Sequence, residues 1–129
     1  MPAASALRIT IVDDQKSIRA LVRGSLQHLG VRQIVECGDG AEALRSLDLH
    51  PAHLVISDLN MPNLDGLELL EAIRKKPGCE KIAFIMLTTR GDAELVRKAV
   101  SLGVNNYLMK PFTIGSLKQK IEAVFGALT

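Results

Sequence analysis

The chain has 129 residues, of which 47% are hydrophobic and 23% charged, and these values exclude a disordered protein and favour one globular domain. A net charge of +2 is too small to indicate nucleic acid as a partner. Cys37 and Cys79 have no metal-ligand spacing, and the chain has neither a membrane-spanning run nor a signal peptide, so we expect a cytoplasmic protein that does not enter a membrane.

Short apolar runs alternate with segments of helical periodicity along the whole chain. The runs predict strands over residues 7–12, 33–37, 53–58, 82–88 and 106–109. The periodic segments predict helices over residues 15–29, 40–49, 67–75, 92–102 and 113–125. In the fourth helix we expect Ala93, Val96, Ala99 and Val100 to face inward.

The strands read as continuous apolar runs rather than as alternating ones. Strands of this kind are buried on both faces, as in a parallel sheet covered by helices on each side. Because there is no internal repeat or linker, residues 1–129 are expected to form a single α/β domain with its core over about residues 7–125.

Polar side chains stand where the predicted strands end. In an open parallel sheet, ligands bind beyond the carboxyl ends of the strands. Three acids, a hydroxyl and an ammonium group stand at or just beyond those ends: Asp13 and Asp14, Asp58, Thr88 and Lys110.

Each of these residues also has an ordinary structural explanation. Asp14 could cap the first helix and Asp58 could open a turn. Thr88 could be a common strand residue, and Lys110 could be one of many solvated lysines. The coincidence of four strand ends nevertheless favours one shared site.

Charge repulsion makes the predicted cluster informative. Two like charges about 4 Å apart repel by roughly 4 kcal/mol at an effective dielectric constant near 20, and one lysine cannot balance three carboxylates. An all-oxygen ligand set points to Mg²⁺ or Mn²⁺ rather than zinc. A metal, a hydroxyl, an ammonium group and a carboxylate together suit phosphoryl transfer, with Asp58 as the best nucleophile candidate.

The motifs resemble a known family when they are taken together. An Asp-Asp pair after the first strand, SDLNMPNLDG from Ser57, Thr88, and Lys110-Pro111-Phe112 resemble the receiver domain of two-component response regulators, and GVNNYLMKPF is most similar to its CheY-like chemotaxis members. The resemblance covers essentially the whole chain. It implies a flavodoxin-like fold with strand order 2-1-3-4-5.

The resemblance also implies a phosphoacceptor and a metal site. Asp58 matches the phosphoacceptor, and Asp14 and Asp58 match side-chain ligands of Mg²⁺. The main-chain carbonyl of Asn60 matches a third ligand, and Asp13 matches the acid that binds the ion through water.

Further positions match a conformational switch. Thr88 matches the switch hydroxyl, Tyr107 the aromatic residue that follows it, and Lys110 the phosphate-binding lysine, with a cis peptide at Lys110-Pro111. Asn60 and Arg90 occupy positions that tune dephosphorylation in the family. Arg90 departs from the acid that several chemotaxis receivers carry there.

The resemblance implies protein partners. We expect a CheA-like sensor histidine kinase as phosphoryl donor, a phosphatase, and a target such as the flagellar motor switch on the face of the fourth helix, fifth strand and fifth helix. Four basic residues on that face favour an acidic target segment: Arg97, Lys98, Lys118 and Lys120. The protein is expected to be a monomer and to catalyse only its own phosphorylation and dephosphorylation.

Three other interpretations remain open at this stage. A magnesium-dependent aspartyl-phosphate phosphohydrolase would need an acid where Asn60 stands. A flavin carrier would place a phosphate beside Asp13 and Asp14, which would repel it. The chain could also be a receiver cut from a longer regulator with a DNA-binding or enzymatic output.

Overall fold

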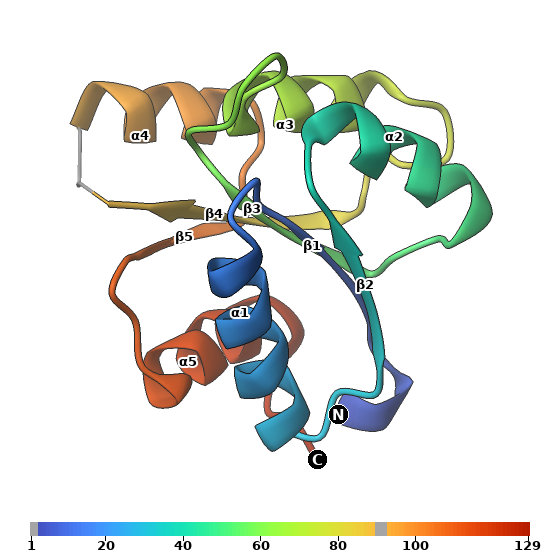
Figure 1. The fold of residues 1–129 in the computed structure, drawn as a ribbon, viewed down its shortest axis with the longest axis vertical. Helices are drawn as coiled ribbons and strands as arrows, with labels where there is room; N and C mark the ends of the chain where they lie inside the picture. The colour runs from blue at the N-terminus through green and yellow to red at the C-terminus, as the bar shows by residue number, and fades with distance from the viewer. Residues whose placement is uncertain (1–2, 90–92) are drawn as a thin grey trace.

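The computed structural model of the chain describes residues 3–89 and 93–129. Strands and α-helices alternate strictly in these residues, after one short 3-10 helix (Figure 1). In chain order the elements are η1 (Ala4–Ala6), β1 (Arg8–Val12), α1 (Lys16–His28), β2 (Gln33–Cys37), α2 (Gly40–Leu49), β3 (Leu54–Asp58), α3 (Gly66–Lys75), β4 (Ala83–Thr88), α4 (Ala93–Ser101), β5 (Asn106–Met109) and α5 (Ile114–Phe125).

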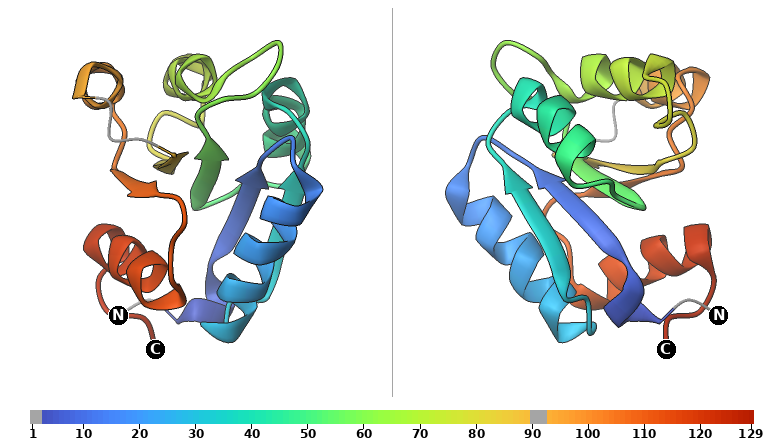
Figure 2. Two further views of the ribbon diagram at one scale, coloured as in Figure 1. Left: turned by 60° about the vertical axis from the view of Figure 1, so that its left-hand side comes forward. Right: turned by 90° about the vertical axis from the view of Figure 1, so that its right-hand side faces the viewer.

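The strands form one parallel sheet in the order β2-β1-β3-β4-β5. Helices α2, α3 and α4 lie on one side of this sheet, and α1 and α5 lie on the other (Figures 1 and 2). The predicted fold class and the strand order implied by the resemblance are therefore confirmed.

The core is divided into two apolar clusters by the sheet. Every residue of β3 and β4 is buried, as the unbroken apolar runs predict. Neighbouring residues of one strand belong to opposite clusters. Val55 belongs to the cluster shared with α2, α3 and α4, whereas Ile56 belongs to the cluster shared with α1 and α5. The two central strands are thereby fixed from both sides, and Asp58 stands at the end of one of them.

The inward face of α4 differs from the predicted one. Ala99 is buried as expected and Val96 is half-buried beside it, but Ala93 is exposed and Val100 is 62% exposed. The core contacts come instead from Ala99 together with Leu95 and Leu102. Residues 95, 99 and 102 have the same helical spacing as residues 93, 96 and 100, so periodicity alone could not choose between the two stripes.

Side-chain caps define where several helices begin. Asp65 and Glu68 form a reciprocal capping box at the start of α3, and Thr113 does the same with Ser116 at α5. The longest helix, α1, has 13 residues, and no helix in the described part of the chain is long and apolar enough to cross a membrane.

Candidate functional site

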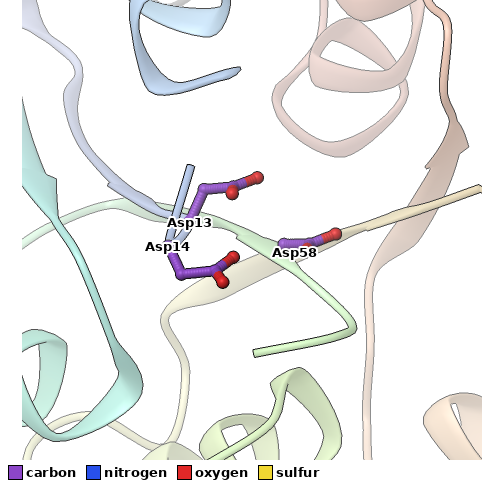
Figure 3. A group of neighbouring side chains, drawn as sticks. All are labelled: Asp13, Asp14 and Asp58. Atoms are coloured by element: carbon purple, nitrogen blue, oxygen red, sulfur yellow. The ribbon is translucent and has the colours of Figure 1, made fainter. Parts of the chain in front are cut away.

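Three aspartates from two strand ends meet at the carboxyl edge of the sheet. Asp13 and Asp14 follow β1, and Asp58 is the last residue of the neighbouring strand β3. One carboxylate oxygen from each lies within 4.8 Å of the other two (Figure 3). The acids that the sequence assigns to separate strand ends are therefore neighbours in space.

Main-chain hydrogen bonds fix the end of β3 where Asp58 stands. Asp58 is in register with Leu87 of β4, and the Leu59 N–H donates to the Leu87 carbonyl at 2.9 Å. The Ser57 hydroxyl donates to the Asp58 carbonyl at 2.9 Å. Asp58 is only 7% exposed, so little of its carboxylate reaches solvent.

Lys110 joins two of the acids. Its Nζ lies 2.9 Å from Asp58 Oδ1 and 3.4 Å from Asp13 Oδ2. The Lys110 N–H donates to the Thr88 carbonyl at 2.7 Å, and the peptide bond from Lys110 to Pro111 is cis. With only 14% of its side chain exposed, Lys110 belongs to the acid cluster and is not a solvated surface lysine.

Burial and charge act in opposite directions in this cluster. Burial raises the pKa of the Asp13 carboxyl above its usual 3.8, against the lowering effects of the Gln15 N–H at 2.9 Å and of Lys110. Burial lowers the pKa of Lys110, but the hydrogen bonds and charges of Asp58 and Asp13 outweigh it, so that this pKa is raised. When the cluster is ionised, the two acids therefore stabilise the positive charge of Lys110, and the cluster as a whole carries an excess of negative charge.

The donor set fits a hard divalent cation. The three acids supply only oxygen ligands, and with Lys110 they leave two negative charges that one divalent ion would balance. Asp14 is exposed and does not cap α1, whose N-cap is Gln15 without a side-chain cap bond. This edge of the sheet therefore offers a set of oxygen ligands that could hold a divalent metal ion.

The remaining predicted residues lie around this cluster. Thr88 is buried at the end of β4, and Asn60 is exposed two residues beyond Asp58. Tyr107 of β5 is 37% exposed, and Thr88 and Tyr107 line the same apolar hollow of about 20 Å³. The ring of Tyr107 lies 5.5 Å from Lys120 Nζ. Arg90 lies outside the described residues.

Arg19 also contacts this region, and no motif in the sequence predicts it. Arg19 of α1 donates a hydrogen bond to the main-chain carbonyl of Asp13 at 2.7 Å. No motif marks an arginine for this contact, because its partner is a main-chain atom and not a particular side chain. Only the packing of α1 across the end of β1 brings the two together.

Comparisons with known proteins agree with the fold. Residues 9–122 match the model of the response regulator receiver domain family. A probable chemotaxis protein CheY of Rhizobium etli is 49% identical over 128 residues, which cover 99% of each chain. The solved structure of chemotaxis protein CheY4 of Vibrio cholerae is 31% identical with a TM-score of 0.86, and the match covers 96% of this chain and 99% of that one.

A further solved structure bears on the acid cluster. The receiver domain of sensor histidine kinase PA1611 from Pseudomonas aeruginosa is 26% identical with a TM-score of 0.84, over 94% of this chain and 98% of that one. That structure has a magnesium ion coordinated in its active site cleft.

The chain is an α/β protein with a doubly wound parallel sheet. Three acids and a lysine form a charged site at the carboxyl ends of its strands. Within this class of α/β proteins, the chain belongs to the response regulator receiver domain family.

Proposed function

We propose that the chain receives a phosphoryl group on Asp58 from a sensor histidine kinase and acts as a chemotaxis response regulator. The observation that carries this proposal is the Asp58 carboxylate, which is almost buried, paired with Lys110 at 2.9 Å and surrounded by Asp13 and Asp14. The 49% identity to a probable chemotaxis protein CheY supports the chemotaxis assignment.

In the proposed reaction, a carboxylate oxygen of Asp58 attacks the phosphorus of a phosphohistidine. The new O–P bond forms while the P–N bond breaks, and the departing imidazole takes a proton from water. Lys110 places its positive charge beside the attacking carboxylate, where it would also attract the phosphoryl oxygens. Thr88, one residue beyond Asp58's register partner Leu87, would donate its hydroxyl to a phosphoryl oxygen.

Mg²⁺ is the cofactor that we propose for this site, with Mn²⁺ as a substitute. Asp14, Asp58 and the main-chain carbonyl of Asn60 would hold the ion directly, and Asp13 would hold it through water. When bound, the ion supplies positive charge that offsets the acids and the incoming phosphoryl oxygens. The protein's own residues orient the Asp58 carboxylate and keep most of it away from water. Asp13 is fully buried and Asp58 nearly so.

The phosphoryl group would be read out on the face formed by α4, β5 and α5. These elements lie along one side of the molecule (Figure 2, left). The elements of this face carry exposed apolar side chains and basic residues, which suit an amphipathic acidic segment such as one from the flagellar motor switch. The apolar ones are Val100 (62% exposed), Tyr107 (37%), Met109 (47%) and Ile114 (39%). The basic ones are Arg97, Lys98, Lys118 and Lys120, of which Lys120 places its Nζ 5.5 Å from the Tyr107 ring.

Loss of the phosphoryl group would return the chain to its resting state. Water would cleave the O–P bond, with Asn60 and Arg90 tuning the rate and a phosphatase accelerating it. We infer no turnover of other substrates: Asn60 stands where an aspartyl-phosphate hydrolase would need a proton donor, and an amide is a poor one.

The experiment that tests this function is incubation with acetyl phosphate, a small-molecule phosphoryl donor, with and without Mg²⁺. The intact wild-type chain should gain the mass of one phosphoryl group only when Mg²⁺ is present. Asp58→Asn should gain none under either condition. A wild-type chain that gains no mass, or an Asp58→Asn chain that gains as much, would exclude the proposed function.

A further inference from the structure

The side chain of Arg19 ties the loop that carries Asp13 and Asp14 to helix α1. Arg19 Nη1 donates to the main-chain carbonyl of Asp13 at 2.7 Å. This carbonyl belongs to the planar peptide group that joins Asp13 to Asp14. A donor that fixes the plane of this peptide therefore constrains the direction in which both side chains leave the main chain.

The guanidinium group of Arg19 is itself held in place. Its Nε lies 3.3 Å from Glu36 Oε1, and Arg23 Nη1 lies 3.1 Å from Glu36 Oε2. Glu36 stands on β2, in register with Ile11 of β1. Because a guanidinium is a rigid planar fork, its orientation by Glu36 also sets the direction of Nη1 toward the Asp13 carbonyl.

The other contacts of Asp13 involve different atoms. The Asp13 N–H donates to the Cys37 carbonyl at 3.1 Å, Asp13 Oδ1 accepts from the Gln15 N–H at 2.9 Å, and Asp13 Oδ2 lies 3.4 Å from Lys110 Nζ. None of these three contacts involves the Asp13 carbonyl. The Arg19 bond adds a contact from within α1 to that carbonyl.

We propose that Arg19 is a positioning residue for the metal-binding acids, oriented by Glu36 and acting through the peptide group between Asp13 and Asp14. This inference rests on the proposed function, because it concerns the Mg²⁺ ligands of that site. Groups that orient metal ligands from outside are typically worth about 10–100-fold in metal affinity. Arg23, which shares Glu36 but is not bonded to Asp13, has no such role.

The test compares the Mg²⁺ affinity of three variants with that of the full wild-type chain. Affinity is measured by titrating Mg²⁺ into the ¹⁵N-labelled protein and following the amide signals of residues 13–15 and 58–60. Arg19→Gln should bind Mg²⁺ about tenfold more weakly than wild type. Arg23→Gln is the matched control, because it removes the other arm of the Glu36 pair, and its affinity should stay within about twofold of wild type.

Unfolding by denaturant in EDTA separates positioning from general stability. A purely structural role predicts that Arg19→Gln and Arg23→Gln lose stability but bind Mg²⁺ equally well, and that result would overturn the inference. Arg19→Lys keeps the positive charge but loses the planar fork that reaches Asp13 and Glu36 from two separate nitrogens. It should therefore bind Mg²⁺ more weakly than wild type even if Arg19→Gln fails to fold, and equal affinity would again contradict the inference.

The wild-type titration distinguishes this inference from the function on which it rests. Wild-type chain that binds no Mg²⁺ would overturn the proposed metal site, and the role of Arg19 with it. Wild-type chain that binds Mg²⁺, together with an Arg19→Gln chain of unchanged affinity, would overturn the role of Arg19 alone.

Discussion

Gly66, the first residue of α3, lies so close to the main chain of Asp58 that no side chain fits between them. A Cβ on Gly66 would collide with the Asp58 carbonyl oxygen, and it would lie 2.7 Å from Met86 Sδ and 2.9 Å from Leu59 Cα. The Gly66 N–H donates to the Leu59 carbonyl at 2.9 Å. The start of α3 and the end of β3 are therefore in direct main-chain contact at the proposed phosphoacceptor.

Gly66→Ala should destabilise the fold by about 1–3 kcal/mol, because backbone atoms cannot move aside as a flexible side chain can. It should also slow phosphorylation by acetyl phosphate, since Asp58 is the residue displaced. Denaturant unfolding and intact-mass kinetics measure the two effects.

Gly24→Ala is the matched control for this substitution. Gly24 lies within α1 with nothing within 4 Å of an added Cβ, so alanine should stabilise the helix by about 0.5–1 kcal/mol. A Gly66→Ala chain as stable as the parent would show that the contact is not tight.

Mg²⁺ should raise the melting temperature of the protein, because it relieves the repulsion among the three acids. A ligand at a hundredfold excess over its dissociation constant adds about 2.7 kcal/mol to the unfolding free energy. EDTA should reverse the shift, and Asp14→Asn should abolish most of it. Glu80→Gln, at an exposed acid remote from the cluster in sequence, should keep the full shift, and an equal loss in both variants would contradict a specific site.

His53 should make stability depend on pH. Its Nδ1 accepts a hydrogen bond from the Arg8 N–H at 3.0 Å, so the fold requires a neutral imidazole. Burial, with a smaller effect of the Arg8 charge, lowers the pKa of His53 from its usual 6.5. The unfolded chain then binds more protons, so this contribution is fully present above pH 6.5 and is lost as the pH falls below that value toward the folded-state pKa.

Denaturant unfolding at several pH values between about 5 and 7.5 measures this contribution. His53→Asn keeps an acceptor but does not titrate, so its stability should fall less than that of wild type toward low pH. His50→Gln, at an exposed imidazole in the same loop, should retain the wild-type profile. Identical profiles for wild type and His53→Asn would exclude this role for His53.

Tyr107 offers a direct optical test of the proposed switch, because the chain has one tyrosine and no tryptophan. Tyr107 is 37% exposed and borders a hollow of only about 20 Å³, so its ring cannot move inward unless neighbouring groups such as Thr88 also move. Acetyl phosphate with Mg²⁺ should reduce the quenching of its fluorescence by acrylamide. Thr88→Ala should weaken that change, and a change that survives in Asp58→Asn would have another cause.

The sequence predicts the fold largely through its apolar runs. The unbroken runs that become β3 and β4 indicate strands buried on both faces, and the structure buries every residue of both. The order of the strands has no such signal in the apolar pattern and came from the resemblance. Strands β1, β3 and β4 each begin one residue later than expected, because Leu7, His53 and Ile82 lie just before the strands and not in them.

Other features depend on three-dimensional packing. Two stripes of residues on α4 have helical spacing and could face inward. Only contact with α3 and the sheet selects the stripe that contains Leu95 and Ala99. The approach of Asp13, Asp14 and Asp58 follows from parallel strands ending at one edge, and could be predicted. The contact of Arg19 with a main-chain carbonyl could not, because every residue carries that acceptor.

The proposed function requires that Asp58, and not one of its acidic neighbours, carries the phosphoryl group. Borohydride reduces an aspartyl phosphate to homoserine, so treatment after phosphorylation by acetyl phosphate leaves a permanent mark at the modified residue. Peptide sequencing by tandem mass spectrometry should find homoserine at position 58 in wild type and none in Asp58→Asn. Homoserine at position 13 or 14, or at no position in a chain that had gained phosphoryl mass, would contradict the account.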